Sequence, residues 1–113
     1  PSLIVAYSPC IAHGVDMLYN QRQQDMAVKS GHWPLFRHDP RLEAAGANPF
    51  KLDSAAPSQS MQTFMDSETR FAMLARSHPD VARQLAAEAQ READQRYRAY
   101  AELAARPAAP KPE

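Results

Sequence analysis

Cys10 is the residue with the most versatile chemistry in this 113-residue chain, and it is the only cysteine. A thiolate can ligate a metal ion or attack a substrate, and His13 follows in a Cys-x-x-His spacing. A single pair of this kind is a weak metal signal, and one thiol can form neither an internal disulfide nor a complete thiolate site. Any metal role of Cys10 must therefore be shared with ligands outside the chain.

Two other interpretations of Cys10 stay open at this point. A lone cysteine is often a small buried hydrophobic residue. A Cys/His pair of nucleophile and base is also conceivable, although the spacing places no orienting acid or oxyanion site beside it.

Other polar, aromatic and sulfur-bearing residues have simpler explanations. The Gln-rich run over residues 20–24 is typical of a solvated helix face. The remaining candidates predict packing, either as an aromatic cluster (His32, Trp33, Phe36, His38) or as a core stripe (Met61, Met65, Met73). Only three glycines occur and they are scattered, so no glycine-rich phosphate-binding loop is present.

The segment before Cys10 has the composition of a buried β-strand. Residues 3–7 are β-branched and aromatic without polar alternation, which is typical of a strand covered on both faces in a parallel sheet. Pro9 lacks the N–H of a central ladder, so we expect the strand to end before Cys10. Ligands of open α/β sheets gather beyond the carboxyl ends of strands, so this position favours a thiol that faces a cofactor.

Short extended segments and helices follow. We expect a helix over residues 16–30 with Asp16 as its N-cap, edge-like strands over 35–38 and 48–54, and a loop or helical turn between them. An amphipathic helix from Met61 to Leu74 and a long helix from about Pro79 to Ala104 complete the second half. The sequence thus predicts an α/β fold with one buried strand, short edge strands and a helical second half.

The predicted sheet is incomplete. Two edge-like strands do not cover a strand that is buried on both faces, and the chain begins at Pro1 without an initiator Met. We therefore expect residues 1–105 to be part of a larger domain and residues 106–113 to form a flexible, proline-rich tail.

Charge and hydropathy exclude two classes of partner. Thirteen Lys and Arg balance thirteen Asp and Glu, which leaves no basic surface for nucleic acid. The longest apolar run, residues 3–6, is too short to span a bilayer, and no basic region precedes it. We expect a cytoplasmic protein that binds neither nucleic acid nor membrane.

Several unusual strings occur in one order along the chain: PSLIVAYSPCIAHG at 1–14, AVKSGHWPLFR at 27–37, NPFKLDS at 48–54 and ETRF at 68–71. Together they closely resemble the end of the thiamine-diphosphate-binding domain of pyruvate:ferredoxin (or flavodoxin) oxidoreductases. The resemblance covers nearly the whole chain and implies that residues 1–105 are the C-terminal portion of this doubly wound thiamine-diphosphate/iron–sulfur domain.

The resemblance also implies a function. Enzymes of this family are large homodimers that oxidatively decarboxylate pyruvate on thiamine diphosphate and Mg²⁺, make acetyl-CoA from CoA, and pass electrons through 4Fe–4S clusters to ferredoxin or flavodoxin. Cys10 matches a cysteine that ligates one 4Fe–4S cluster, with the other thiolates upstream. A cluster takes four thiolates and this chain holds one, so we expect the piece to be inactive alone.

Some alternatives stay open under this resemblance. The electron acceptor is ferredoxin or flavodoxin, and the substrate is pyruvate or another 2-oxoacid. A reading from a different class is a stand-alone helical protein-interaction module without catalysis, in which the C-terminal helices dock on a partner and Cys10 is merely buried.

Overall fold

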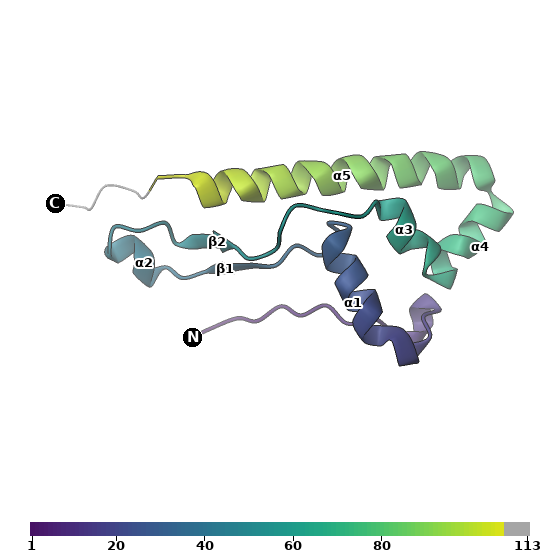
Figure 1. The fold of residues 1–113 in the computed structure, drawn as a ribbon, viewed down its shortest axis with the longest axis horizontal. Coiled ribbons are helices and arrows are strands. Elements are labelled where there is room, and N and C mark those ends of the chain that lie inside the picture. Colours follow the sequence, from purple (N-terminus) through teal and green to yellow (C-terminus); the bar gives the residue numbers. More distant parts are fainter. Residues whose placement is uncertain (108–113) are drawn as a thin grey trace.

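The computed structural model describes residues 1–107 and is mostly helical, with one small antiparallel sheet (Figure 1). Its elements follow one another as η1 (Ile11–His13), η2 (Met17–Tyr19), α1 (Asn20–Lys29), β1 (Phe36–His38), α2 (Arg41–Ala44), β2 (Phe50–Leu52), α3 (Met61–Asp66), α4 (Thr69–Ser77) and α5 (Pro79–Ala105). The predicted tail over 106–113 lies outside the described residues from position 108 onward. None of the helices in the described range is long and apolar enough to cross a bilayer.

Helix α5 runs along one side of the molecule, and α3, α4 and β2 pack against it (Figure 1). Its start follows from the sequence, because Pro79 occupies the first turn and Asp80 supplies a first-turn acid. The predicted break before α5 is confirmed. At the end of α4, the Ser77 hydroxyl donates to the carbonyl of Met73 at 3.1 Å.

The predicted extended segments on either side of α2 are confirmed, and they form a hairpin. Strands β1 and β2 are antiparallel, and Phe36 pairs with Leu52 and His38 with Phe50. The rings of Phe36 and Phe50 stack with centroids 5.3 Å apart, and both lie against Tyr100 of α5 at 5.0 and 5.9 Å. This aromatic contact holds the hairpin on the C-terminal half of α5.

Asn48 ties the hairpin to the end of α5. Its Nδ2 donates to the carbonyls of Leu103, Ala104 and Arg106 at 2.9, 3.1 and 3.1 Å, and its Oδ1 accepts from the Phe50 N–H at 2.9 Å. The last carbonyls of a helix lack partners within the helix, so this side chain satisfies groups that are otherwise left to solvent.

We expect Asn48→Ala to lower the free energy of unfolding by about 1–2 kcal/mol, because donors to the α5 carbonyls are lost. Asn48→Asp retains the acceptor for Phe50 but places a negative charge at the negative end of the helix, so it is expected to destabilise at least as much. Urea unfolding of the three proteins measures this order. Equal midpoints for all three would contradict the capping role.

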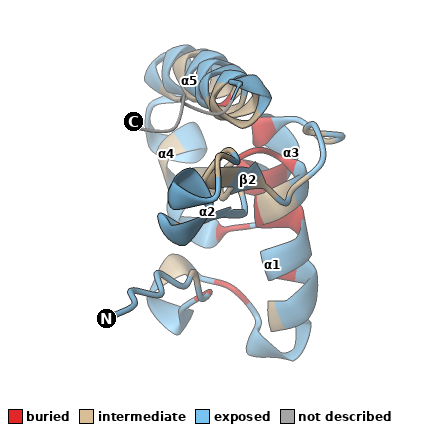
Figure 2. Cartoon of the chain, turned by 90° about the vertical axis from the view of Figure 1, so that its left-hand side faces the viewer, coloured by how far each residue is buried: buried red, intermediate tan, exposed pale blue. Residues whose placement is uncertain are grey.

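The main core lies where α1, α3 and α5 meet, and Figure 2 shows its buried residues concentrated on α1 and α3. The residues that form it are Met26, Ala27, Met61, Phe64, Met65 and Ala93. Two of the three predicted core methionines are therefore confirmed. The prediction is wrong for Met73, which is 62% exposed on α4.

The helix predicted over residues 16–30 is confirmed with a different start. The carboxylate of Asp16 accepts from the Leu18 N–H at 3.0 Å and caps the short turn η2, from which α1 continues. Gly31, with φ of 76°, adopts the left-handed conformation just past the end of α1.

The buried strand predicted over residues 3–7 is wrong for this chain. These residues belong to no strand, and Leu3, Ile4 and Val5 are 88%, 88% and 68% exposed. A strand requires the backbone of a neighbour, and the two strands of the described residues pair with each other. The segment therefore crosses the surface as an irregular, apolar stretch (Figure 1).

The single helix predicted from Met61 to Leu74 is also wrong, because it is interrupted between α3 and α4. The Ser67 hydroxyl donates to the Phe64 carbonyl at 2.5 Å, and Glu68 adopts an extended conformation with φ of −119° and ψ of 125°. Side-chain hydroxyls that bond to nearby backbone groups compete with the hydrogen bonds of the helix. The apolar periodicity of the sequence continues across the break, so it does not reveal where the helix is interrupted.

Candidate functional site

Cys10 lies on the surface, in the segment that joins residues 3–7 to η1. The residue is exposed, in extended conformation, and caps η1. Its Sγ accepts a hydrogen bond from the backbone N–H of Ala12 at 3.4 Å, and its carbonyl accepts from the His13 N–H at 2.9 Å. The interpretation of Cys10 as a buried hydrophobic residue is therefore wrong for this chain, and with it the premise that Cys10 is merely buried in an interaction module.

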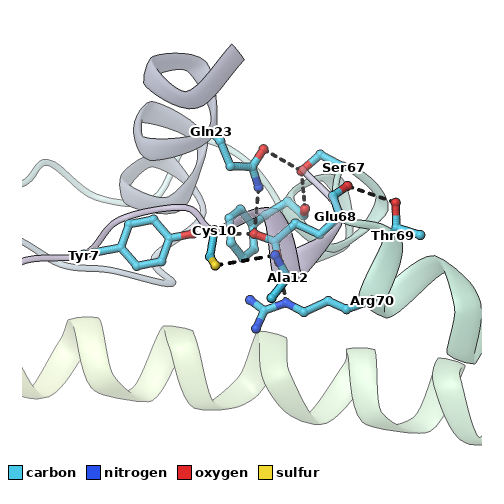
Figure 3. Close-up of polar contacts among 10 residues, drawn as sticks. Tyr7, Cys10, Ala12, Gln23, Ser67, Glu68, Thr69 and Arg70 are labelled. Atoms are coloured by element: carbon cyan, nitrogen blue, oxygen red, sulfur yellow. Dashed lines mark hydrogen bonds and ion pairs between the residues drawn. The ribbon is translucent and has the colours of Figure 1, made fainter. Parts of the chain in front are cut away.

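A buried carboxylate lies beside this segment. Glu68 is 0% exposed, and its Oε1 accepts from Gln23 Nε2 at 3.0 Å while its Oε2 meets Arg70 Nε at 2.5 Å. The Tyr7 hydroxyl points at the same Oε1 from 3.5 Å (Figure 3). A buried charge is tolerated when it is paired and hydrogen-bonded, and Glu68 meets both conditions.

Aromatic rings cover this polar cluster. The Tyr7 ring lies 5.7 Å from both His32 and Trp33, and His32 stacks on Phe64 at 4.5 Å. Burial, aided by the negative charge of Glu68, raises the pKa of Tyr7, while burial lowers the pKa of His32. Tyr7 thus keeps the proton that it directs at Glu68. The predicted aromatic cluster is confirmed for His32 and Trp33, but Phe36 packs on Phe50 and Tyr100 instead, and His38 is exposed on β1.

Two residues of this cluster, Gln23 and Glu68, were not predicted from the sequence. Gln23 belongs to the Gln-rich run, which is typical of a solvated helix face, yet its side chain is buried and only 4% exposed. The spacing of Gln23 does indicate its burial, because the apolar residues Met26 and Ala27 follow it by three and four positions and lie on the same face of α1. Glu68 gave no comparable signal, since its partners come from the N-terminal segment, α1 and α4.

Within residues 1–107, the Cys-x-x-His spacing does not produce a metal site. In the described range, no three His, Cys, Asp or Glu side chains gather where a metal ion would need them. His13 Nδ1 is buried and has no hydrogen-bond partner in that range. What the chain offers is one exposed thiol with a backbone N–H directed at its sulfur, which suits a single ligand of a shared thiolate site.

Comparison with curated proteins finds extensive similarity. The chain is 48% identical to a pyruvate-flavodoxin oxidoreductase of Nostoc over 106 aligned residues, and this alignment covers 94% of the chain. It is 45% identical over 104 residues to the pyruvate:ferredoxin oxidoreductase of Moorella thermoacetica, and 42% identical over 81 residues to the mitochondrial pyruvate dehydrogenase [NADP(+)] of Euglena gracilis. The chain spans only 9%, 9% and 4% of these relatives. No protein-family model matches it.

Proposed function

Because the chain corresponds to one short part of the pyruvate-flavodoxin and pyruvate:ferredoxin oxidoreductases, we propose that it contributes Cys10 as one ligand of a 4Fe–4S cluster in the whole enzyme. When bound, such a cluster accepts and passes on electrons. The chain's own part is to hold one thiolate at the surface of a folded segment, with the N–H of Ala12 directed at the sulfur. Hydrogen bonds to cluster sulfurs tune the reduction potential, so this contact belongs to the function as well as to the fold.

The single observation that supports this proposal most strongly is the exposure of Cys10. A free cysteine is among the residue types most often buried, whereas this thiol is open to ligands from outside the chain. The other thiolates belong to the remainder of the enzyme.

The proposal extends to the domain of the whole enzyme to which the chain belongs. Residues 1–105 are the C-terminal portion of a doubly wound thiamine-diphosphate/iron–sulfur domain, in which the rest of the enzyme covers residues 3–7. The 88% exposure of Leu3 and Ile4 supports this placement, because exposed apolar side chains that follow one another in a segment mark a surface that another part of a protein contacts. The remainder of the enzyme supplies the sites for thiamine diphosphate and Mg²⁺.

The whole protein is then a cytoplasmic homodimer that oxidises pyruvate and CoA to acetyl-CoA and CO₂. It transfers the two electrons of this oxidation to ferredoxin or flavodoxin. The names of the relatives, which combine pyruvate with flavodoxin in one and with ferredoxin in another, support this assignment.

An activity assay tests the proposed reaction. We expect the anaerobically purified full-length protein to reduce flavodoxin or ferredoxin only when pyruvate and CoA are both present, and the 113-residue chain to reduce neither. Absorbance of the carrier and formation of acetyl-CoA are the two readouts. Reduction with another 2-oxoacid but not with pyruvate would refute the substrate, and no reduction by a fully loaded protein would refute the reaction.

A further inference from the structure

We propose that Glu68 and Thr69, at the junction of α3 and α4, are positioning residues for Cys10. They hold the two ends of the segment over residues 7–14, and Cys10 lies between these ends. The inference rests on the proposed function of Cys10 and deepens it, because it names the part of the fold that fixes where the thiolate lies.

Glu68 holds the beginning of the segment. Its carboxylate is fully buried, and the Tyr7 hydroxyl points at it from the segment while Gln23 donates to it from α1 (Figure 3). The Tyr7 ring also packs against the core beside Trp33. Pro9, directly before Cys10, is buried as well. The chain is therefore anchored up to the residue that precedes the thiol.

Thr69 holds the end of the segment. Its hydroxyl donates to the Gly14 carbonyl at 2.9 Å, and its backbone N–H approaches the same oxygen at 3.5 Å. Gly14 has φ of 72°, and a Cβ at this position would lie 2.3 Å from Thr69 Cβ. The backbone of the segment thus approaches α4 more closely than a residue with a side chain permits.

Cys10 itself has no such anchor. Among the described residues, the hydrogen bond to its Sγ comes from Ala12, which lies within the same segment. The position of the sulfur relative to the folded body is therefore set by the ends of the segment. The two ends are held by consecutive residues, and Glu68 is extended between α3 and α4.

The test uses the anaerobically purified full-length enzyme and four variants. Cys10→Ser identifies the cluster signal in electron paramagnetic resonance that depends on this cysteine. Thr69→Val removes the hydroxyl at nearly constant volume, Thr69→Ser retains it as the matched control, and Glu68→Gln removes the negative charge from the carboxylate cluster. The readouts are the reduction potential and spectrum of that signal, together with hydrogen exchange of residues 7–14.

We expect Thr69→Val and Glu68→Gln to shift the potential of the signal that Cys10→Ser identifies, and to speed exchange of amides in residues 7–14 by about tenfold. Thr69→Ser should restore the parent potential and exchange. Exchange in α5 reports the overall fold and is expected to stay unchanged. A purely structural role would speed exchange without moving the potential.

Two results overturn the inference in distinguishable ways. If Cys10→Ser changes a cluster signal but Thr69→Val and Glu68→Gln leave that signal and its potential unchanged, the positioning role is wrong and the ligand role stands. If Cys10→Ser leaves every cluster signal and the iron content unchanged, the ligand role is wrong and the positioning role falls with it.

Discussion

Replacing Cys10 by serine in the full-length enzyme is expected to remove one 4Fe–4S cluster, which is about four iron atoms per polypeptide. Serine has nearly the same size, but its hydroxyl is a much poorer iron ligand than a thiolate, so the cluster loses one of its four protein bonds. We expect the rate of pyruvate-dependent reduction of flavodoxin or ferredoxin to fall by at least about a hundredfold. Mutating a residue that only hydrogen-bonds to a metal ligand already lowers metal affinity or activity by about 10–100-fold, and Cys10 is the ligand itself.

Ser8→Ala is the matched control for this substitution. The Ser8 hydroxyl donates to the neighbouring Pro9 carbonyl at 3.2 Å, and Ser8 is exposed two residues before Cys10. The Ser8→Ala variant therefore tests whether any change in this segment has the same effect. Iron content, the spectrum of the reduced clusters and the rate of carrier reduction are the measurements. If the Cys10→Ser variant has the same iron content and the same rate of electron transfer as the parent enzyme, Cys10 is not a cluster ligand.

Phe64→Ala is expected to have the largest effect on stability. Phe64 is 0% exposed at the centre of the core and stacks on His32 with ring centroids 4.5 Å apart. Truncating a buried Phe to Ala typically costs about 3–5 kcal/mol, since transfer free energy is lost and a cavity remains. The total stability of a domain is about 5–15 kcal/mol, so this one change removes a large part of it.

Met73→Ala provides the contrast, because Met73 is 62% exposed on α4 and a surface substitution changes stability by about 0.5 kcal/mol or less. Urea unfolding of the chain, followed by circular dichroism, measures both variants. Similar losses for the two variants would contradict the placement of the core between α1, α3 and α5.

The sequence predicts best where local signals and packing agree. The hairpin follows from proline punctuation and from Phe50 and Leu52 alternating with polar residues, and it forms with these two residues in β2. The start of α5 follows from Pro79 and Asp80, and the helix packs on α3 and α4 with Ala93 in the core. In these elements the local preference and the observed contacts point to the same structure.

The failures arise where the outcome depends on distant partners. The apolar composition of residues 3–7 indicates a preference for burial, but a strand forms only where a neighbouring backbone accepts its hydrogen bonds. Among residues 1–107 no strand pairs with this segment. Glu68 could not be predicted as a buried anchor, because its partners Tyr7 and Gln23 are 61 and 45 residues away in sequence. Such contacts leave no periodic signal.

Cys10 carries one prediction that the structure leaves untested and one that it corrects. Its chemical role was inferred from a resemblance over the whole chain, while the position just past a buried strand was inferred from composition. The structure corrects the second, because the thiol lies on an irregular surface segment that the α3–α4 junction holds at Tyr7 and Gly14.

The most direct test of the central claim is a crystal structure of the anaerobically purified full-length enzyme, with iron located by its anomalous scattering. We expect Cys10 Sγ to be bonded to an iron atom of a 4Fe–4S cluster whose other three thiolates come from outside this chain. Clusters whose irons are all ligated by other residues, with Cys10 Sγ bonded to none of them, would contradict it.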